Sequence, residues 1–186
     1  NQMASGRCWG FAGLNLMRLQ VVDSLELNTF EFSQNYFMFW DKLEKANYFL
    51  ENIIKSRDET YESRLITHLL KAPVQDGGQW DMFVNLINKY GAVPKDVMPE
   101  TNHSSKSGAM NYILTHKLRE FASILRKKPA KNSSALKKDM METIYNLLAM
   151  FLGQPPDVIN WSTRNKDNRH IVISDMTPID FCKKYA

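Results

Sequence analysis

Cysteine is scarce in this chain, which has two among its 186 residues. Cys8 and Cys182 lie far apart in the sequence and do not form the disulfide framework of a small secreted domain, so a reducing compartment fits best. The chain also lacks CxxC and HExxH patterns, and its four histidines do not have the spacing of metal ligands. We therefore expect no metal and no cofactor.

Long hydrophobic runs are absent as well. The longest apolar stretch, Leu147 to Leu152, is far shorter than the roughly 18 residues of a membrane-spanning helix. The polar N-terminus has no signal-peptide pattern, and the chain has no internal repeat or low-complexity segment. Hydrophobic residues nevertheless make up 44% of the chain, which is enough for a sizeable core and suits one domain or a large part of one.

Positive charge is concentrated in one region, although the net charge is a modest +4. The region contains the basic residues Lys117, Arg119, Arg126, Lys127, Lys128, Lys131, Lys137 and Lys138. Few acidic residues accompany them, and such a cluster can bind phosphate backbones by releasing counterions. A solvated helix face with its connecting loop is the more ordinary interpretation of the same pattern. The sequence leaves both interpretations open.

Apolar residues recur at helical spacing through most of the chain. The spacing predicts helices over residues 8–19, 34–56, 63–70, 80–90, 109–128 and 135–152. Ser33 and Ser134 are the expected caps of the second and the sixth of these helices. Residues 102–108 are polar and predict a mobile loop. β-branched runs at 158–162 and 171–173 predict two short strands, and Thr177-Pro178 predicts the start of a last helix.

The first nineteen residues, NQMASGRCWGFAGLNLMRL, contain the strongest candidate for chemistry. A helix that starts at Cys8 places the sulfur at the helix N-terminus, where unpaired N–H groups and the helix dipole favour the thiolate. Arg7 adds a positive charge nearby, and a partly exposed thiolate is the form in which cysteine is a nucleophile. A lone cysteine in an apolar helix is, however, more often a small buried hydrophobe.

The segment around Cys8 resembles the nucleophile segment of papain-like cysteine peptidases, with matches at Gln2, Ser5, Gly6, Cys8, Trp9, Phe11 and Ala12. Ser5 stands where that signature has a disulfide-forming cysteine, and Arg7 stands where it has a small residue. The Gly-Arg-Cys-Trp form without the disulfide cysteine resembles the bleomycin hydrolase and aminopeptidase C branch. Residues 32–34, 40–42 and 76–82 resemble the eukaryotic bleomycin hydrolases of that branch, so the similarity runs over nearly the whole chain.

The resemblance implies an α+β papain-like fold, present here mainly as its helical N-terminal lobe. Residues 1–100 are then the nucleophile-bearing lobe, residues 101–156 a helical-hairpin insertion, and residues 157–186 the start of the following strand and helix region. Because the chain begins at Asn1 and stops inside an expected helix, we expect a truncated or processed chain.

The resemblance also implies a cytoplasmic thiol aminopeptidase that hydrolyses N-terminal peptide bonds and the amide of bleomycin. Cys8 is the expected nucleophile, and the Gln2 side chain and the Cys8 backbone N–H are the expected oxyanion donors. Gly77, Gly78 and Trp9 are the expected substrate-binding residues. Members of this branch form hexameric rings, and some bind nucleic acid, for which Lys117, Arg119, Arg126, Lys127, Lys128 and Lys131 are the candidates here.

The general base is not evident in the sequence. In papain-like enzymes the histidine and the asparagine that orients it come from the C-terminal half. His170 is the one histidine at a similar separation from Cys8, but no Trp-rich segment follows it, and His68, His103 and His116 do not match the family pattern. We therefore expect that these 186 residues lack the catalytic His and Asn and do not turn over alone. A non-catalytic basic helical module for nucleic-acid binding or ring assembly is the alternative, and an acyltransferase of papain-like fold is a weaker one.

Overall fold

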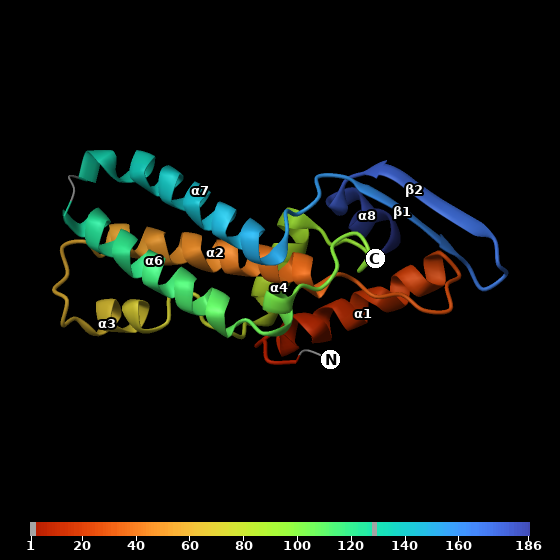
Figure 1. Ribbon diagram of the computed structural model, residues 1–186, viewed down its shortest axis with the longest axis horizontal. Coiled ribbons are helices and arrows are strands. Elements are labelled where there is room, and N and C mark those ends of the chain that lie inside the picture. The colour runs from red at the N-terminus through yellow and green to blue at the C-terminus, as the bar shows by residue number, and fades with distance from the viewer. Residues whose placement is uncertain (1–2, 128–129) are drawn as a thin grey trace.

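The computed structural model describes residues 3–127 and 130–186, which form a helical body with one β-hairpin (Figure 1). The helices are α1 (Cys8–Ser24), α2 (Gln34–Lys55), α3 (Arg64–Lys71), α4 (Trp80–Tyr90), α5 (Asn102–Ser105), α6 (Gly108–Lys127), α7 (Ser133–Leu152) and α8 (Pro178–Tyr185). A single 3-10 turn, η1 (Ala130–Asn132), precedes α7. Strands β1 (Ile159–Arg164) and β2 (His170–Met176) pair in antiparallel fashion. This is the helix-rich architecture that the sequence predicted.

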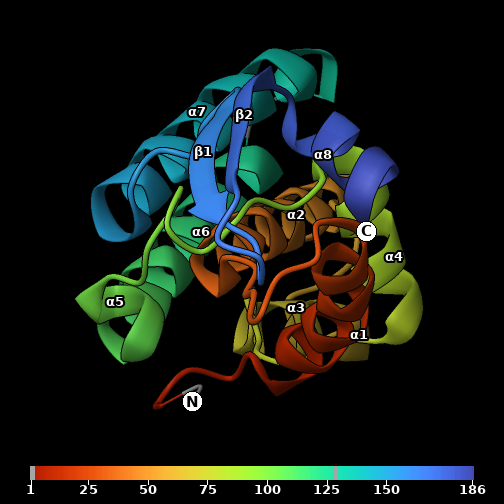
Figure 2. The ribbon, with the colours of Figure 1, turned by 90° about the vertical axis from the view of Figure 1, so that its right-hand side faces the viewer.

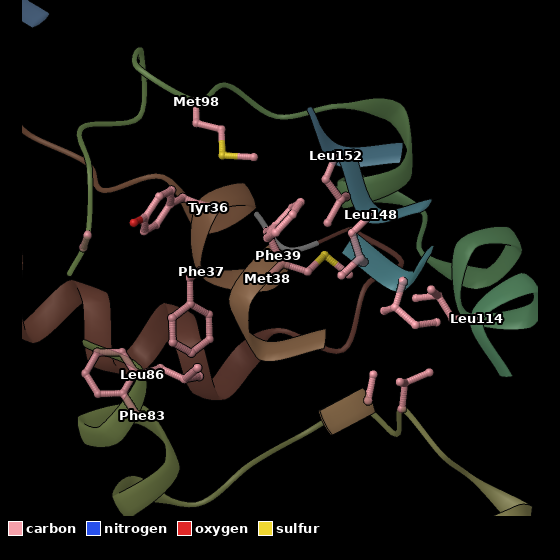
Figure 3. Close-up of a cluster of buried hydrophobic side chains, with 14 of the residues drawn as sticks. Tyr36, Phe37, Met38, Phe39, Phe83, Leu86, Met98, Leu114, Leu148 and Leu152 are labelled. Atoms are coloured by element: carbon pink, nitrogen blue, oxygen red, sulfur yellow. The ribbon is translucent and has the colours of Figure 1, made fainter. Parts of the chain in front are cut away.

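Helix α2 lies at the centre of the fold. Figure 2 shows it surrounded by α1, α3, α4, α6 and α7, and each of these helices packs against it. The reason is its sequence, because apolar side chains occur on more than one face of the helix and all of them need cover. The buried residues of α2 include Phe37, Met38, Phe39, Phe49 and Ile53. Figure 3 shows Phe37, Met38 and Phe39 of this helix among side chains of the neighbouring elements.

Hydroxyl side chains cap the starts of α2, α3 and α8. The side chains of Ser33, Ser63 and Thr177 each accept a hydrogen bond from a backbone N–H in the first turn of the helix that follows. The prediction of Ser33 as a cap is confirmed. The prediction for Ser134 is wrong, because α7 already begins at Ser133 and its N-cap, Asn132, makes no side-chain capping bond.

Other boundaries also differ from the sequence prediction. Helix α1 continues beyond Leu19 to Ser24, since Val21 is buried against the core. Residues 102–108 are not a loop: Thr101 and Ser104 form a reciprocal capping box that starts α5. Apolar periodicity gives no sign of such a short helix, because side-chain hydrogen bonds define it.

Helices α6 and α7 form the predicted hairpin, and both pack along α2 (Figure 1). The amide of Asn35 donates hydrogen bonds to the carbonyls of Pro99 (2.8 Å) and Leu152 (2.7 Å), so the end of α7 is attached directly to α2. The division of the chain at residues 100 and 156 stays a prediction.

The β-hairpin is attached at two places. Phe30 contacts Trp161 on β1 and Phe181 on α8 through aromatic packing. The hairpin turn is attached to the segment after α1, where the Lys166 backbone N–H donates to the Glu26 carbonyl (2.8 Å). In the described part of the chain, no helix is long and apolar enough to cross a membrane.

The central position of α2 predicts a strong effect of Phe39→Ala. Phe39 is fully buried between α2 and its neighbours, so the substitution is expected to lower the free energy of unfolding by about 3–5 kcal/mol. Tyr48→Ala is the matched control on the same helix, since Tyr48 is 66% exposed, and it is expected to change stability by less than about 0.5 kcal/mol. Denaturant titration followed by circular dichroism measures both, and equal effects would contradict the packing.

Candidate active site

Cys8 is the first residue of α1, and its side chain is exposed. The N-cap residue, Arg7, makes no side-chain cap bond, and its carbonyl accepts the first helical hydrogen bond from Phe11 N–H (3.0 Å). The first N–H groups of the helix therefore have no partner within the helix. The predicted helix start is confirmed, and exposure removes the alternative in which Cys8 is a buried hydrophobe. Cys182, by contrast, is buried, and desolvation raises the pKa of its thiol to about 11.

Arg7 holds the loop that precedes Cys8. Its guanidinium is buried and makes two parallel hydrogen bonds to the carboxylate of Glu100, at 3.0 and 2.9 Å. The Nε atom also donates to Ser5 Oγ (2.8 Å). The positive charge expected near the thiol is thus paired with Glu100, and the arginine acts mainly as a fixed bidentate link.

The segment 100–107 supports the same loop from outside. Ala4 N–H donates to the Ser105 carbonyl (3.0 Å), and the Ala4 carbonyl accepts from Ser107 N–H (3.2 Å). Ser104 Oγ donates to Glu100 (2.7 Å), which fixes the carboxylate that holds Arg7. Sequence reasoning missed Glu100, since it lies 93 residues from Arg7 and no motif contains it.

The glycine pair lies directly against the nucleophile loop. Gly77 has φ of 82°, and its N–H donates to the Gly6 carbonyl (3.4 Å). A Cβ atom at Gly78 would lie 2.7–2.8 Å from ring atoms of Trp9, and one at Gly6 would lie 2.3 Å from Asp76 Cβ. The structure therefore places Gly77 and Gly78 against Gly6 and Trp9, which flank Cys8 in the chain, while the substrate-binding role of these residues stays a prediction.

Two buried lysines of α2 donate hydrogen bonds to the glycine segment, residues 74–78. Lys42 Nζ donates to the Val74 carbonyl and to Asp76 Oδ1, both at 2.8 Å. Lys45 Nζ donates to the Gly77 carbonyl (2.7 Å) and to Asp41 Oδ2 (2.9 Å). Burial lowers the pKa of Lys45 and raises the pKa of Asp41, because desolvation penalises both charged forms. The sequence did not single out this pair.

A cavity of about 920 Å³ lies between α2, α3, α4 and the glycine segment. Its wall includes Asp41, Lys45, His68, Gly77 and Gly78. The glycine pair therefore lines this cavity and is only partly buried.

The four histidines do not join Cys8. In the described residues no hydrogen bond connects Cys8 Sγ to a histidine. His103 packs against Phe151, and His116 lies beside Tyr112. His170 is exposed at the start of β2. The same residues contain no group of three or more His, Cys, Asp or Glu side chains that could hold a metal. Gln2, the expected oxyanion donor, lies outside the described residues.

Part of the basic cluster makes contacts within the fold. Arg119 donates to the carbonyls of Leu70 (2.8 Å) and Lys71 (3.2 Å) at the end of α3, and Arg126 donates to Ser56 O (3.0 Å) just after α2. Both are contacts that satisfy helix C-termini. Lys117 pairs with Glu120 and Lys137 with Glu51. Lys127, Lys131 and Lys138 are exposed, and Lys128 lies outside the described residues.

An exposed cysteine at a helix N-terminus, beside a paired-glycine segment and without a disulfide, is the arrangement expected of a thiol peptidase lobe. The sequence model of the Peptidase C1-like family matches residues 1–186, and the chain belongs to this family.

Named relatives agree with this membership. The chain is 53% identical over 188 residues to the aminopeptidase C of Listeria innocua, covering 100% of this chain and 43% of that protein. It is 42% identical over 193 residues to the bleomycin hydrolase of Oryctolagus cuniculus, covering 70% of that sequence. The crystal structure of PepW from Lactobacillus rhamnosis superposes with a TM-score of 0.96 at 47% identity, over 100% of this chain and 43% of that one. The fold is thus that of a papain-like peptidase lobe, and the chain spans less than half the length of most of these relatives.

The Arg7–Glu100 pair predicts a specific stability loss. Glu100→Gln leaves the buried Arg7 guanidinium without a counter-charge, so we expect the free energy of unfolding to fall by about 2–4 kcal/mol. This is toward the lower end of the cost of breaking a buried ion pair, because Glu100 is partly exposed. Glu31→Gln breaks the exposed pair with Lys95 and is expected to cost less than about 1 kcal/mol. Denaturant titration compares the two, and hydrogen exchange should localise the Glu100 effect to residues 4–7 and 100–107. A Glu100→Gln protein as stable as Glu31→Gln would contradict the link.

Gly78→Ala tests the contact between the two loops. The added methyl overlaps the Trp9 ring, whose centroid already lies 5.0 Å from that of Phe37. We therefore expect overpacking to lower the free energy of unfolding by about 1–3 kcal/mol. Gly108→Ala is the control, because nothing lies within 4 Å of its added Cβ. Thermal unfolding compares the two variants, and an unchanged midpoint for Gly78→Ala would show that Trp9 does not lie against Gly78.

Proposed function

We propose that the chain is the nucleophile-bearing part of a thiol aminopeptidase of the bleomycin hydrolase type. The substrates are peptides with a free N-terminus, cleaved at the first bond, and the amide of bleomycin. The observation that carries the proposal is the exposed thiol of Cys8 at the N-terminus of α1, held beside Gly77 and Gly78 in a chain of the Peptidase C1-like family. The names of the relatives support the same activity.

In this proposal the Cys8 thiolate attacks the carbonyl carbon of the scissile bond, the C–N bond breaks, and the amine leaves with the proton that the base has taken from Cys8. Water then hydrolyses the thioester of the acyl-enzyme, which releases the acyl product and restores the thiol. The Cys8 backbone N–H belongs to the first turn of α1, where such groups lack helical partners, and it is one donor to the oxyanion. The Gln2 side chain is the second donor. Each donor of this kind contributes about 3–4 kcal/mol to lowering the barrier.

The substrate main chain is proposed to bind along Gly78. Gly77 uses both of its main-chain groups internally, with its N–H on Gly6 and its carbonyl on Lys45. Among the described residues no hydrogen bond uses the N–H or the carbonyl of Gly78. An extended peptide pairs with such open main-chain groups as an added strand would. Trp9 lies against Gly78 and, in the proposal, supports it from the side of Cys8.

The base that takes the Cys8 proton is proposed to come from another part of the protein. None of the four histidines is bonded to Cys8 in the described residues, and the relatives named above are longer than this chain. A histidine oriented by an asparagine supplies this function in papain-like enzymes. The 186 residues alone are accordingly proposed to be inactive.

Ring assembly, cytoplasmic location and nucleic-acid binding are further proposals that follow from the resemblance. Exposed apolar side chains on the α6–α7 hairpin, Tyr112, Ile113 and Met150, are compatible with a subunit contact in a hexamer. Nucleic-acid binding has less support, since Arg119 and Arg126 contact the ends of helices. The peptidase is therefore the function that the geometry supports best.

Replacing the nucleophile tests the proposal. In the full-length protein, Cys8→Ala is expected to reduce hydrolysis of an aminoacyl aminomethylcoumarin by at least about a thousandfold, because no acyl-enzyme forms without the thiolate. Cys182→Ala is the matched control and should keep wild-type activity, since Cys182 is buried and hydrogen-bonded to the Ala92 carbonyl. An N-acetylated substrate should not be cleaved. Activity that survives Cys8→Ala would overturn the assignment.

A further inference from the structure

The orientation of the Gly77–Gly78 peptide unit is set by one buried ammonium group. The Gly77 carbonyl points to Lys45 Nζ at 2.7 Å. In a trans peptide the carbonyl and the following N–H point to opposite sides, so the Gly78 N–H is directed away from Lys45. The group that the proposed function offers to substrate is therefore oriented by what holds the Gly77 carbonyl.

Apart from the Trp9 ring beside Gly78, the other restraints on this peptide unit are weak. Gly77 has φ of 82° and open space where a side chain would be, so its backbone gains no restraint from packing. Its other main-chain bond, from Gly77 N–H to the Gly6 carbonyl, is long at 3.4 Å. The shorter bond to the charged Lys45 is the stronger of the two, since hydrogen bonds from ionised donors are roughly twice as strong as neutral ones.

Lys45 is itself fixed and connects the glycine segment to the nucleophile side. Lys45 is buried, with 8% of its surface exposed, and its Nζ donates a hydrogen bond to Asp41 Oδ2. The same Nζ atom lies 5.3 Å from the centroid of the Trp9 ring. Asp41 is buried as well, and no partner is found for its Oδ1 atom among the described residues. Lys42, one helical turn earlier, holds Val74 and Asp76 and does not reach the Gly77–Gly78 peptide unit.

A buried pair of this kind is a weak source of stability. Desolvation opposes both charges, and apolar residues of similar size often stabilise such a position as well or better. Burial accordingly shifts the pKa values of Lys45 and Asp41 toward their neutral forms. The contact to the Gly77 carbonyl is what a hydrophobic replacement would lose, and this contact lies at the proposed substrate-binding segment.

We propose that Lys45, held by Asp41, is a positioning residue for main-chain recognition: its ammonium fixes the Gly77 carbonyl and thereby presents Gly78 to the main chain of a peptide bound at Cys8. This inference rests on the proposed function. It assigns Lys45 no contact with the reacting atoms, so the intrinsic reactivity of the Cys8 thiol does not depend on it.

The test compares two reagents that alkylate the same cysteine in the full-length protein. Iodoacetamide reads the reactivity of Cys8 without using the glycine segment. A peptidyl epoxysuccinate also alkylates Cys8, but its main chain must first bind beside it. The ratio of the two second-order rate constants, peptidyl reagent over iodoacetamide, therefore measures main-chain recognition separately from thiol chemistry. Mass spectrometry confirms that Cys8 is the modified residue.

The main variant is Asp41→Leu/Lys45→Met, which removes both members of the pair and leaves no unpaired buried charge. We expect its rate ratio to fall about tenfold, the loss of one well-placed hydrogen-bonding group, with an unchanged iodoacetamide rate. Lys45→Arg keeps a positive charge beside Asp41, so it is the variant to use if the double variant does not fold. Its bulkier head group should lower the rate ratio about threefold. The control is Glu51→Leu/Lys137→Met, which removes another ion pair of α2 and should leave both rates unchanged.

The outcomes separate the two proposals. If the wild-type protein reacts no faster with the peptidyl reagent than with iodoacetamide, the proposed function itself fails. If the wild type prefers the peptidyl reagent and both Lys45 variants keep the same ratio, the positioning role of Lys45 is overturned. A variant in which both rates fall in parallel also overturns it, because Lys45 would then support Cys8 only as part of the fold.

Discussion

The hydrogen bond from the buried Lys45 ammonium to the Gly77 carbonyl is the contact on which the candidate site depends. It fixes a glycine segment that has no side chain of its own with which to pack. Through Trp9, the same lysine lies next to the start of α1, where Cys8 is exposed. The geometry of the nucleophile relative to the glycine segment thus follows from charged groups buried on α2, and no covalent link contributes to it.

A second charged contact fixes the nucleophile loop, residues 4–7. Arg7 and Glu100 join the residues before Cys8 to the segment that leads into α5. The papain-like signature has a disulfide cysteine at the position of Ser5, and here Ser5 Oγ accepts a hydrogen bond from Arg7 instead. Bidentate arginine–carboxylate geometry restricts orientation as well as distance, which makes it a suitable non-covalent link.

These contacts explain which parts of the fold and site could be predicted from the sequence. Helices such as α2 and α4 were predictable because apolar spacing is encoded within each segment, and α2 has a side-chain cap at Ser33 as well. Cys8 and the glycine pair were found through short motifs. Glu100 and Lys45 were not found, because their roles arise from contacts across 93 and 32 residues of sequence. Helix α5 was missed for a related reason: hydrogen bonds of Thr101 and Ser104, and not apolar periodicity, define it.

The basic residues of the α6–α7 region also have functions that depend on contacts distant in sequence. From the sequence, Arg119 and Arg126 were equivalent to the exposed lysines around them. In the fold their guanidinium groups reach the carbonyls at the ends of α3 and α2, so they connect α6 to both helices. The cluster is thus partly a set of internal contacts, and the electrostatic surface that remains is smaller than the sequence indicated.

The most direct test of the account is a crystal structure of the full-length protein alkylated at Cys8 by a peptidyl inhibitor. The account predicts that the inhibitor main chain is hydrogen-bonded to the N–H and carbonyl of Gly78, with Lys45 still donating to the Gly77 carbonyl. An inhibitor that is attached to Cys8 but whose main chain avoids Gly78, or a Gly77 carbonyl turned away from Lys45, would contradict it.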